Sequence, residues 1–174
     1  RLGSNWDFGL SPSIQRSYSV GQYVTTIVDS TADRTFGRRY IFGGIDQTTL
    51  AVESRVNVTF TPRLSFQLYA QPFFSSGDYD ALKELSTPGE FSFLEYGTDL
   101  GTIREDGGAF EIDPDGSGNA PAFRVNDPDF NFRSVRGNAV LRWEWRRGST
   151  LFLVWQQGRE DRLLASRTTG LGGP

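Results

Sequence analysis

The chain of 174 residues contains no cysteine and no histidine. Without cysteine, it has no disulfide framework, thiol nucleophile or thiolate metal site. Without histidine, it has no histidine-based catalytic triad and no histidine-ligated zinc. Its 18 lysine and arginine residues are outnumbered by 21 aspartate and glutamate residues, and the net charge of −3 argues against a nucleic-acid partner.

Long apolar runs are also lacking. The mean hydropathy is −0.42, and no apolar stretch approaches the ~18 residues that would predict a transmembrane helix. A transmembrane β-barrel is not excluded, because its alternating strands give a much weaker hydropathy signal. The sequence starts at Arg1 with no secretory hydrophobic region, so we expect the signal peptide of an exported protein to lie upstream.

Glycine and aromatic residues are abundant, with 20 Gly, 14 Phe, 6 Tyr and 4 Trp, and this composition favours an all-β protein rich in turns. The clearest pattern covers residues 50–74, where apolar and polar residues alternate in two limbs around Thr61, Pro62 and Arg63. Each limb has about 11 residues, which exceeds the usual globular strand and approaches the ~9 to 11 that cross a bilayer. This stretch predicts a membrane β-hairpin.

Similar alternation starts at Trp6 and again at Phe132, and a second tight turn is predicted at Arg147, Gly148 and Ser149. We therefore predict an all-β antiparallel meander of about five long strands, forming part of a transmembrane β-barrel over residues 1–159. A closed bacterial barrel needs at least eight strands, so we expect either a fragment of a longer chain or closure by other chains. Residues 160–174 are predicted to be a polar tail, either disordered or a truncated strand.

The stretch 75–129 is rich in Gly, Asp, Glu and Pro and predicts one long extracellular loop, mobile and lacking regular structure apart from a possible short helix at 79–85. Seven of its acidic residues are candidates for a carboxylate pair in glycoside chemistry; they are Glu105, Asp106, Glu111, Asp113, Asp115, Asp127 and Asp129. Five of its aromatic residues are candidates for stacking on sugars, for plugging a lumen or for packing within the loop; they are Tyr79, Phe91, Phe93, Tyr96 and Phe110.

A calcium site is a further prediction from this loop. Oxygen-bearing side chains at alternate positions resemble the start of an EF-hand loop; they are Asp113, Asp115, Ser117 and Asn119. The twelfth position is Arg124, where a bidentate glutamate is needed, and a simple Asp-Pro-Asp-Gly turn explains the same residues.

Successive side chains of a strand point to opposite faces of the sheet, so the alternation predicts one apolar face and one polar face. The residues predicted to face lipid are Leu50, Val52, Val56, Val58, Leu64, Phe66, Leu68, Val135, Leu141 and Trp143. The residues predicted to face the lumen are Glu53, Arg55, Arg136, Arg142 and Glu144. A solvated face of a soluble sheet would show the same alternation. Aromatic residues gather near the predicted short turns, as an interfacial girdle requires, and this favours the barrel.

Several stretches resemble a known family. They include Gln22-Tyr23-Val24-Thr25-Thr26, Leu68-Tyr69-Ala70-Gln71-Pro72-Phe73, and residues 35–42, 46–50, 60–62, 76–79 and 129–157. In this order they are similar to the C-terminal region of bacterial outer-membrane β-barrels of uncharacterised function, whose N-terminal domain is similar to family 9 carbohydrate-binding modules. That domain is absent here, and family members end in a further strand with a terminal aromatic residue. The resemblance therefore implies truncation at both ends.

These observations predict a non-catalytic segment of a bacterial outer-membrane barrel with a pore, transport or surface-anchoring role. The expected partners are outer-membrane lipid and the remaining strands of a full-length barrel or other chains, and a glycan is a further candidate. No cofactor is expected apart from the calcium ion considered above. One alternative is a soluble all-β binding module, and a second is a surface glycan hydrolase that uses the loop carboxylates.

Overall fold

The computed structural model describes residues 5–164, which contain nine β-strands and one 3-10 turn (η1, Asp33–Thr35) but no α-helix. The predicted all-β class with antiparallel sheets is confirmed. Over the same residues, no helix has the length and apolar character needed to cross a membrane.

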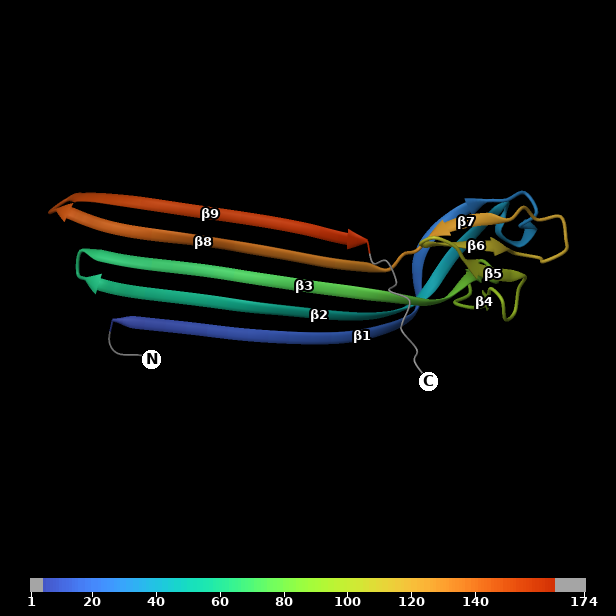
Figure 1. The fold of residues 1–174 in the computed structure, drawn as a ribbon, viewed down its shortest axis with the longest axis horizontal. Helices are drawn as coiled ribbons and strands as arrows, with labels where there is room; N and C mark the ends of the chain where they lie inside the picture. Colours follow the sequence, from blue (N-terminus) through green and yellow to red (C-terminus); the bar gives the residue numbers. More distant parts are fainter. Residues whose placement is uncertain (1–4, 165–174) are drawn as a thin grey trace. The chain divides into compact units, whose positions relative to one another are not determined.

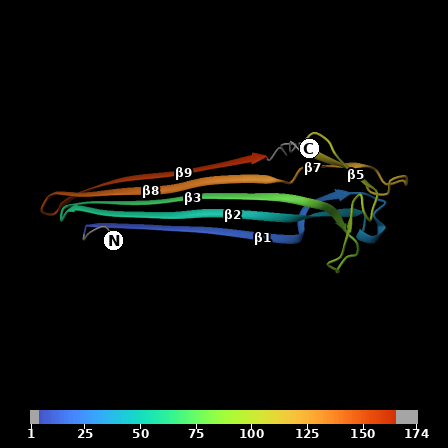
Figure 2. The ribbon, with the colours of Figure 1, turned by 60° about the horizontal axis from the view of Figure 1, so that its bottom comes forward.

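The main sheet has five long strands in the order β1-β2-β3-β8-β9. Two views rotated by 60° show them side by side (Figures 1 and 2). Their bounds are β1 Trp6–Val28, β2 Arg38–Thr61, β3 Leu64–Leu85, β8 Phe130–Arg146 and β9 Ser149–Leu164. A short strand, β4 (Phe93–Glu95), pairs with the end of β3. Consecutive long strands are therefore neighbours, as in the predicted meander.

Both predicted hairpin turns are present. Pro62 and Arg63 join β2 to β3, and Arg147 and Gly148 join β8 to β9. Gly148 has a positive φ of 79°, a conformation that glycine adopts without a steric penalty from a side chain.

Residues 160–164, predicted to begin a polar tail that is either disordered or a truncated strand, form the end of β9, which continues to Leu164. Glu160 and Asp161 form ion pairs with Arg136 and Arg133 of β8, so charged pairs replace apolar alternation along this part of the hairpin. Residues 165–174 lie outside the described part of the chain.

The predicted loop 75–129 is in large part a folded region. The helix suggested for 79–85 is wrong, because β3 continues to Leu85 and pairs with β4 through Lys83 opposite Glu95 and Leu85 opposite Phe93. Ala81 has a positive φ of 45° in this segment, and this local departure from strand geometry obscures the alternation.

A separate three-stranded antiparallel sheet follows, with β5 Thr102–Glu105, β6 Ala109–Asp113 and β7 Phe123–Asn126.

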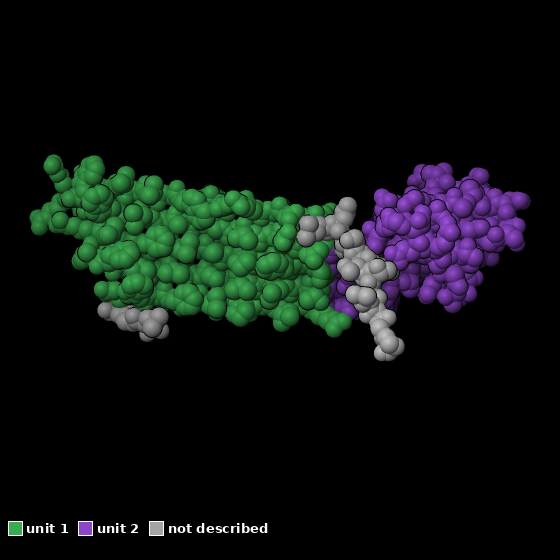
Figure 3. Space-filling view, in the orientation of Figure 1, with its two compact units in different colours: residues 1–16, 48–76, 131–163 green, residues 17–47, 77–130, 164–174 purple. Residues whose placement is uncertain are grey.

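The chain divides into two compact units, coloured green and purple in Figure 3. Within the described residues, unit 1 comprises 5–16, 48–76 and 131–163, and unit 2 comprises 17–47, 77–130 and 164. The strands β1, β2 and β3 each contribute residues to both units.

Unit 2 has a hydrophobic core contributed by both of its sheets. The buried core residues are Ile41, Leu82, Tyr96, Ile112 and Val125. Val24 and Ile27 of β1 pack against this cluster, as do Phe110 and Phe123 of the three-stranded sheet. Burying an aliphatic side chain of this size contributes about 1.5 to 3 kcal/mol, so this core accounts for much of the stability of unit 2.

Unit 1 differs because many of its large apolar residues remain exposed or half-buried, although Val58 of β2 is buried. Every residue of β1 from position 6 to position 16 is exposed. On β8 and β9, Trp143 is 45% exposed and Leu153 is 64% exposed. Among the described residues, unit 1 is thus one sheet layer whose apolar residues are not covered by a second layer.

Candidate functional site

Side-chain contacts between neighbouring strands show which residues of unit 1 share a face. Side chains that meet across two strands lie on the same side of the sheet. The contacts are Arg55 over the Tyr69 ring at 5.7 Å, the rings of Phe73 and Phe132 at 6.0 Å, and an ion pair of 2.9 Å between Arg136 and Glu160. They link β2, β3, β8 and β9 in turn, so the alternate residues that are mostly polar on each of these strands form one continuous face.

All five residues predicted to face a lumen fall on this polar face by strand alternation. Arg55 forms an ion pair of 2.8 Å with Glu53, and Glu144 accepts a hydrogen bond from the Gly148 N–H at 3.3 Å. The Arg55 side chain is 64% exposed, so this pair adds little stability and mainly sets the local charge pattern. Glu160 belongs to the same face but is not among the predicted residues, because the apolar residues of β9 end before it and the strand is predicted to end with them.

The ten residues predicted to face lipid alternate along their strands with the residues of the polar face. They therefore lie on the opposite, apolar face. A side chain added at Gly137 of this face would lie 3.8 Å from the Trp155 ring. Trp155 is therefore on the apolar face, and so are Leu151 and Leu153, which alternate with it along β9. All four tryptophans belong to it and are about half exposed; they are Trp6, Trp143, Trp145 and Trp155.

The limit of the apolar face shifts from strand to strand. On β3 the apolar residues continue to Phe74, whereas on β8 they end at Val135, before Arg133. On β9 they end at Trp155, and Gln157 and Arg159 follow on the same parity. The apolar band thus crosses the paired strands obliquely towards the turn end.

Unit 2 contains a buried ionic network centred on Arg39 of β2. Its guanidinium donates to Asp29 at 2.6 Å and to the two oxygens of Glu84 at 3.0 and 2.7 Å. The Thr31 backbone and hydroxyl donate to Asp29, and the Tyr96 hydroxyl donates to Glu84 at 2.7 Å. The network connects the β1–β2 connection, β3 and the segment after β4, so it holds these parts of unit 2 in one arrangement.

The pKa values in this network follow from burial and hydrogen bonding. Burial opposes ionisation of Asp29, but hydrogen bonds from Thr31 and Arg39 outweigh it and hold the pKa of Asp29 below its ordinary value. Burial raises the pKa of Tyr96, and the hydrogen bond to the Glu84 carboxylate raises it further. At neutral pH, the network therefore contains an ionised Asp29 and a protonated Tyr96.

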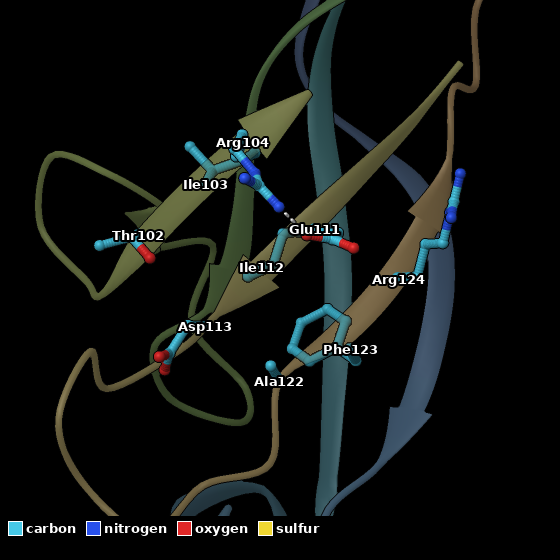
Figure 4. A pocket seen from close by; sticks show the side chains of 9 residues that line it. All are labelled: Thr102, Ile103, Arg104, Glu111, Ile112, Asp113, Ala122, Phe123 and Arg124. Carbon is cyan, nitrogen blue, oxygen red and sulfur yellow. Dashed lines mark hydrogen bonds and ion pairs between the residues drawn. The ribbon is translucent and has the colours of Figure 1, made fainter. Parts of the chain in front are cut away.

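The three-stranded sheet presents a hollow of about 610 Å³, shown in Figure 4. Arg104 and Glu111 are opposite one another on β5 and β6 and form an ion pair of 2.6 Å, and Arg124 of β7 is next in the same row. The hydrogen bond and charge of Arg104 lower the pKa of Glu111. A general acid for glycoside cleavage needs a raised pKa, so this geometry does not favour Glu111 in that role.

The other acidic and aromatic candidates in the predicted loop have structural contacts of their own. Asp129 accepts a hydrogen bond from the Tyr79 N–H, and Asp127 accepts one from the Asp129 N–H. Tyr96 is buried in the core and Phe110 packs against it, whereas Phe91 is 74% exposed. The buried position of Tyr96 removes it from the candidates for stacking on a sugar.

The residues of the predicted calcium loop lie at and after the end of β6. Asp113 accepts hydrogen bonds from the N–H groups of Asp115 at 3.3 Å and Gly116 at 2.9 Å, and Asp115 accepts one from Ala120 at 2.9 Å. Ser117 and Asn119 are exposed. Across residues 5–164, no group of three or more acidic residues is arranged to hold a metal ion. The turn geometry explains both carboxylates, and calcium stays a prediction.

Comparisons of the chain with protein-family models, curated proteins and solved structures find no match. The family resemblance noted from the sequence therefore stays a prediction.

Proposed function

We propose that unit 1 is a wall segment of a transmembrane β-barrel in the bacterial outer membrane. Its apolar face meets lipid and its polar face lines a lumen. The segment has no catalytic activity of its own and serves a pore, transport or surface-anchoring role.

The observation that carries this proposal is the uncovered apolar face of a single-layer antiparallel sheet. A soluble protein rarely leaves an apolar patch of this extent without a partner, because its contact with water is unfavourable. A membrane barrel wall needs this arrangement, with an apolar exterior opposite a polar interior. The oblique limit of the apolar band also supports the proposal, since barrel strands are tilted by roughly 35 to 45° from the membrane normal.

The edges of the sheet indicate what else such a wall requires. In the described part of the chain, β1 pairs only with β2, and β9 pairs only with β8. Unpaired backbone groups in hydrocarbon cost several kcal/mol each, so a membrane sheet must close on itself. We therefore infer that further strands pair with β1 and β9, supplied by a longer chain or by other chains.

The position of all four tryptophans on the apolar face allows a direct test. The full chain is refolded into phosphatidylcholine vesicles, with or without bromine atoms on the acyl chains, and its tryptophan fluorescence is measured. Contact with lipid predicts strong quenching by the brominated chains and weak quenching by aqueous iodide. A soluble module would show the reverse and would stay monodisperse without detergent, and that result would refute the barrel.

A further inference from the structure

The apolar face of unit 1 is not uniform, because a hollow of about 390 Å³ lies across β3, β8 and β9. Ala70 and Gly137 are among its lining residues and contribute little or no side chain, while Leu68, Val135 and Trp155 supply larger apolar groups. A Cβ at Gly137 would lie 3.2 Å from the Tyr69 carbonyl oxygen and 3.8 Å from the Trp155 ring. A side chain at Gly137 would thus be in tight contact with the Tyr69 backbone, whereas the hollow of about 390 Å³ in front of Gly137 offers space for an apolar group from outside the chain.

A second hollow, of about 660 Å³, adjoins the first, since Val135 and Arg159 line both. It contains Arg133, whose guanidinium donates two hydrogen bonds to Asp161, at 2.9 and 3.2 Å. When the Gln157 amide oxygen is turned towards Arg159, it accepts hydrogen bonds from Nε at 2.7 Å and Nη2 at 3.3 Å. The apolar hollow therefore leads to two arginines, Arg133 and Arg159, and the lining there also includes the acidic residues Asp161 and Glu160.

This combination matches the chemistry of a phosphorylated lipid. An acyl chain gains from apolar burial, and a guanidinium binds phosphate oxygens through directed, charge-assisted hydrogen bonds. Asp161 neutralises part of the charge of Arg133, so Arg159 is the stronger of the two candidates for contact with phosphate.

We propose that these two hollows form a binding site for one membrane lipid with a phosphate headgroup of net negative charge. One acyl chain lies against Gly137 and Trp155, and the phosphate contacts Arg159, with Arg133 next to it. This inference rests on the proposed function, because it requires the apolar face to meet lipid. It adds selectivity for anionic lipid at one place on that face.

Native mass spectrometry of the full chain in detergent tests the site by counting the lipids retained by each protein molecule. Phosphatidylglycerol, which is anionic, and phosphatidylcholine, which is zwitterionic, are each titrated. We expect one phosphatidylglycerol to be retained at a concentration about tenfold lower than phosphatidylcholine, as one charge-assisted contact would provide. Inorganic phosphate in excess should not displace the lipid, because it has no acyl chain.

Two variants separate the parts of the site. Arg159→Gln should remove the preference for phosphatidylglycerol, and Gly137→Leu should reduce retention of both lipids by filling the apolar hollow. The matched controls are Arg136→Gln and Gly9→Leu on the polar face, which should behave as the wild type. Gly137→Leu is interpreted only when its circular dichroism matches the wild type, whereas Arg159→Gln changes an exposed side chain and tests the headgroup contact independently.

Equal retention of the two lipids by the wild type, or an unchanged preference in Arg159→Gln, would overturn the lipid site. If brominated lipids quench the tryptophans while no preference is seen, the lipid site alone fails and the barrel wall stands. If the chain is not quenched and needs no detergent, both proposals fall.

Discussion

Arg39 and Glu84 are 45 residues apart in the sequence, yet Nη1 of Arg39 donates to both carboxylate oxygens of Glu84. Their side chains are only 9% and 14% exposed, and Asp29 completes the ionic group from the other side of Arg39. A buried charge that loses its partner is strongly destabilising, so this contact makes the arrangement of β2 and β3 within unit 2 specific.

Glu84→Gln should destabilise unit 2 by about 3 kcal/mol, the lower end of the range for breaking a buried pair, because glutamine still accepts a hydrogen bond. Hydrogen exchange at the amides of Ile41 and Leu82 would measure the loss. Glu111→Gln, which removes the exposed pair with Arg104, is the matched control and should leave these amides unchanged. Equal protection in wild type and Glu84→Gln would show that the network does not stabilise unit 2.

Acid should weaken unit 2 through Asp29. Its pKa is lowered in the folded state from the ordinary value of 3.8, so the unfolded chain binds this proton more readily. The stability that Asp29 contributes is complete above pH 3.8 and is lost as the pH falls through the lower folded value. Acid titration followed by near-ultraviolet circular dichroism should show a shallower loss in Asp29→Asn than in the wild type. Identical slopes would contradict this role.

Alkali should act through Tyr96 in the opposite direction. Its pKa is raised in the folded state from the ordinary value of 10.0, so its contribution is complete below pH 10.0 and is lost as the pH rises through the folded value. Absorbance at the tyrosinate wavelength should show one tyrosine that ionises only as unit 2 unfolds. Tyr96→Phe should lack this late phase, and its persistence in that variant would assign it to another tyrosine.

Val56→Arg should cost ~2 to 4 kcal/mol if the apolar face meets the middle of a bilayer, because the guanidinium would be placed in hydrocarbon. Asn57→Arg is the matched control on the polar face and should cost far less. Folding titrations in lipid vesicles would compare the two. No loss for Val56→Arg, or an equal loss for Asn57→Arg, would count against the assigned faces.

The absence of cysteine makes the orientation of the proposed barrel wall in a membrane testable by labelling. Short turns of bacterial barrels face the periplasm and longer connections face outwards. Ser117→Cys in unit 2 should therefore react with a membrane-impermeant maleimide on intact cells, and Arg147→Cys in the β8–β9 turn should react only after the outer membrane is opened. The reverse pattern would place unit 2 in the periplasm.

Alternation of apolar and polar side chains along a strand is a local property, so the sequence alone predicts strands and turns wherever this alternation persists. It predicted the hairpin at Pro62, the turn at Gly148 and the two parities of β2, β3 and β8, because residues two apart on a strand share a face whatever surrounds them. The same reasoning missed the end of β9, where charged residues such as Glu160 follow no apolar rhythm.

Only the tertiary structure could assemble unit 2, since its core and its ionic network join residues from separate segments of the chain. Ile41 and Ile112 pack in one cluster although no local pattern relates them, and Arg39 meets Glu84 across two strands. The hollow beside Gly137 is equally nonlocal, because Trp155 reaches it from the next strand. Strand periodicity depends on backbone geometry within one segment, whereas these contacts depend on which segments become neighbours in the folded chain.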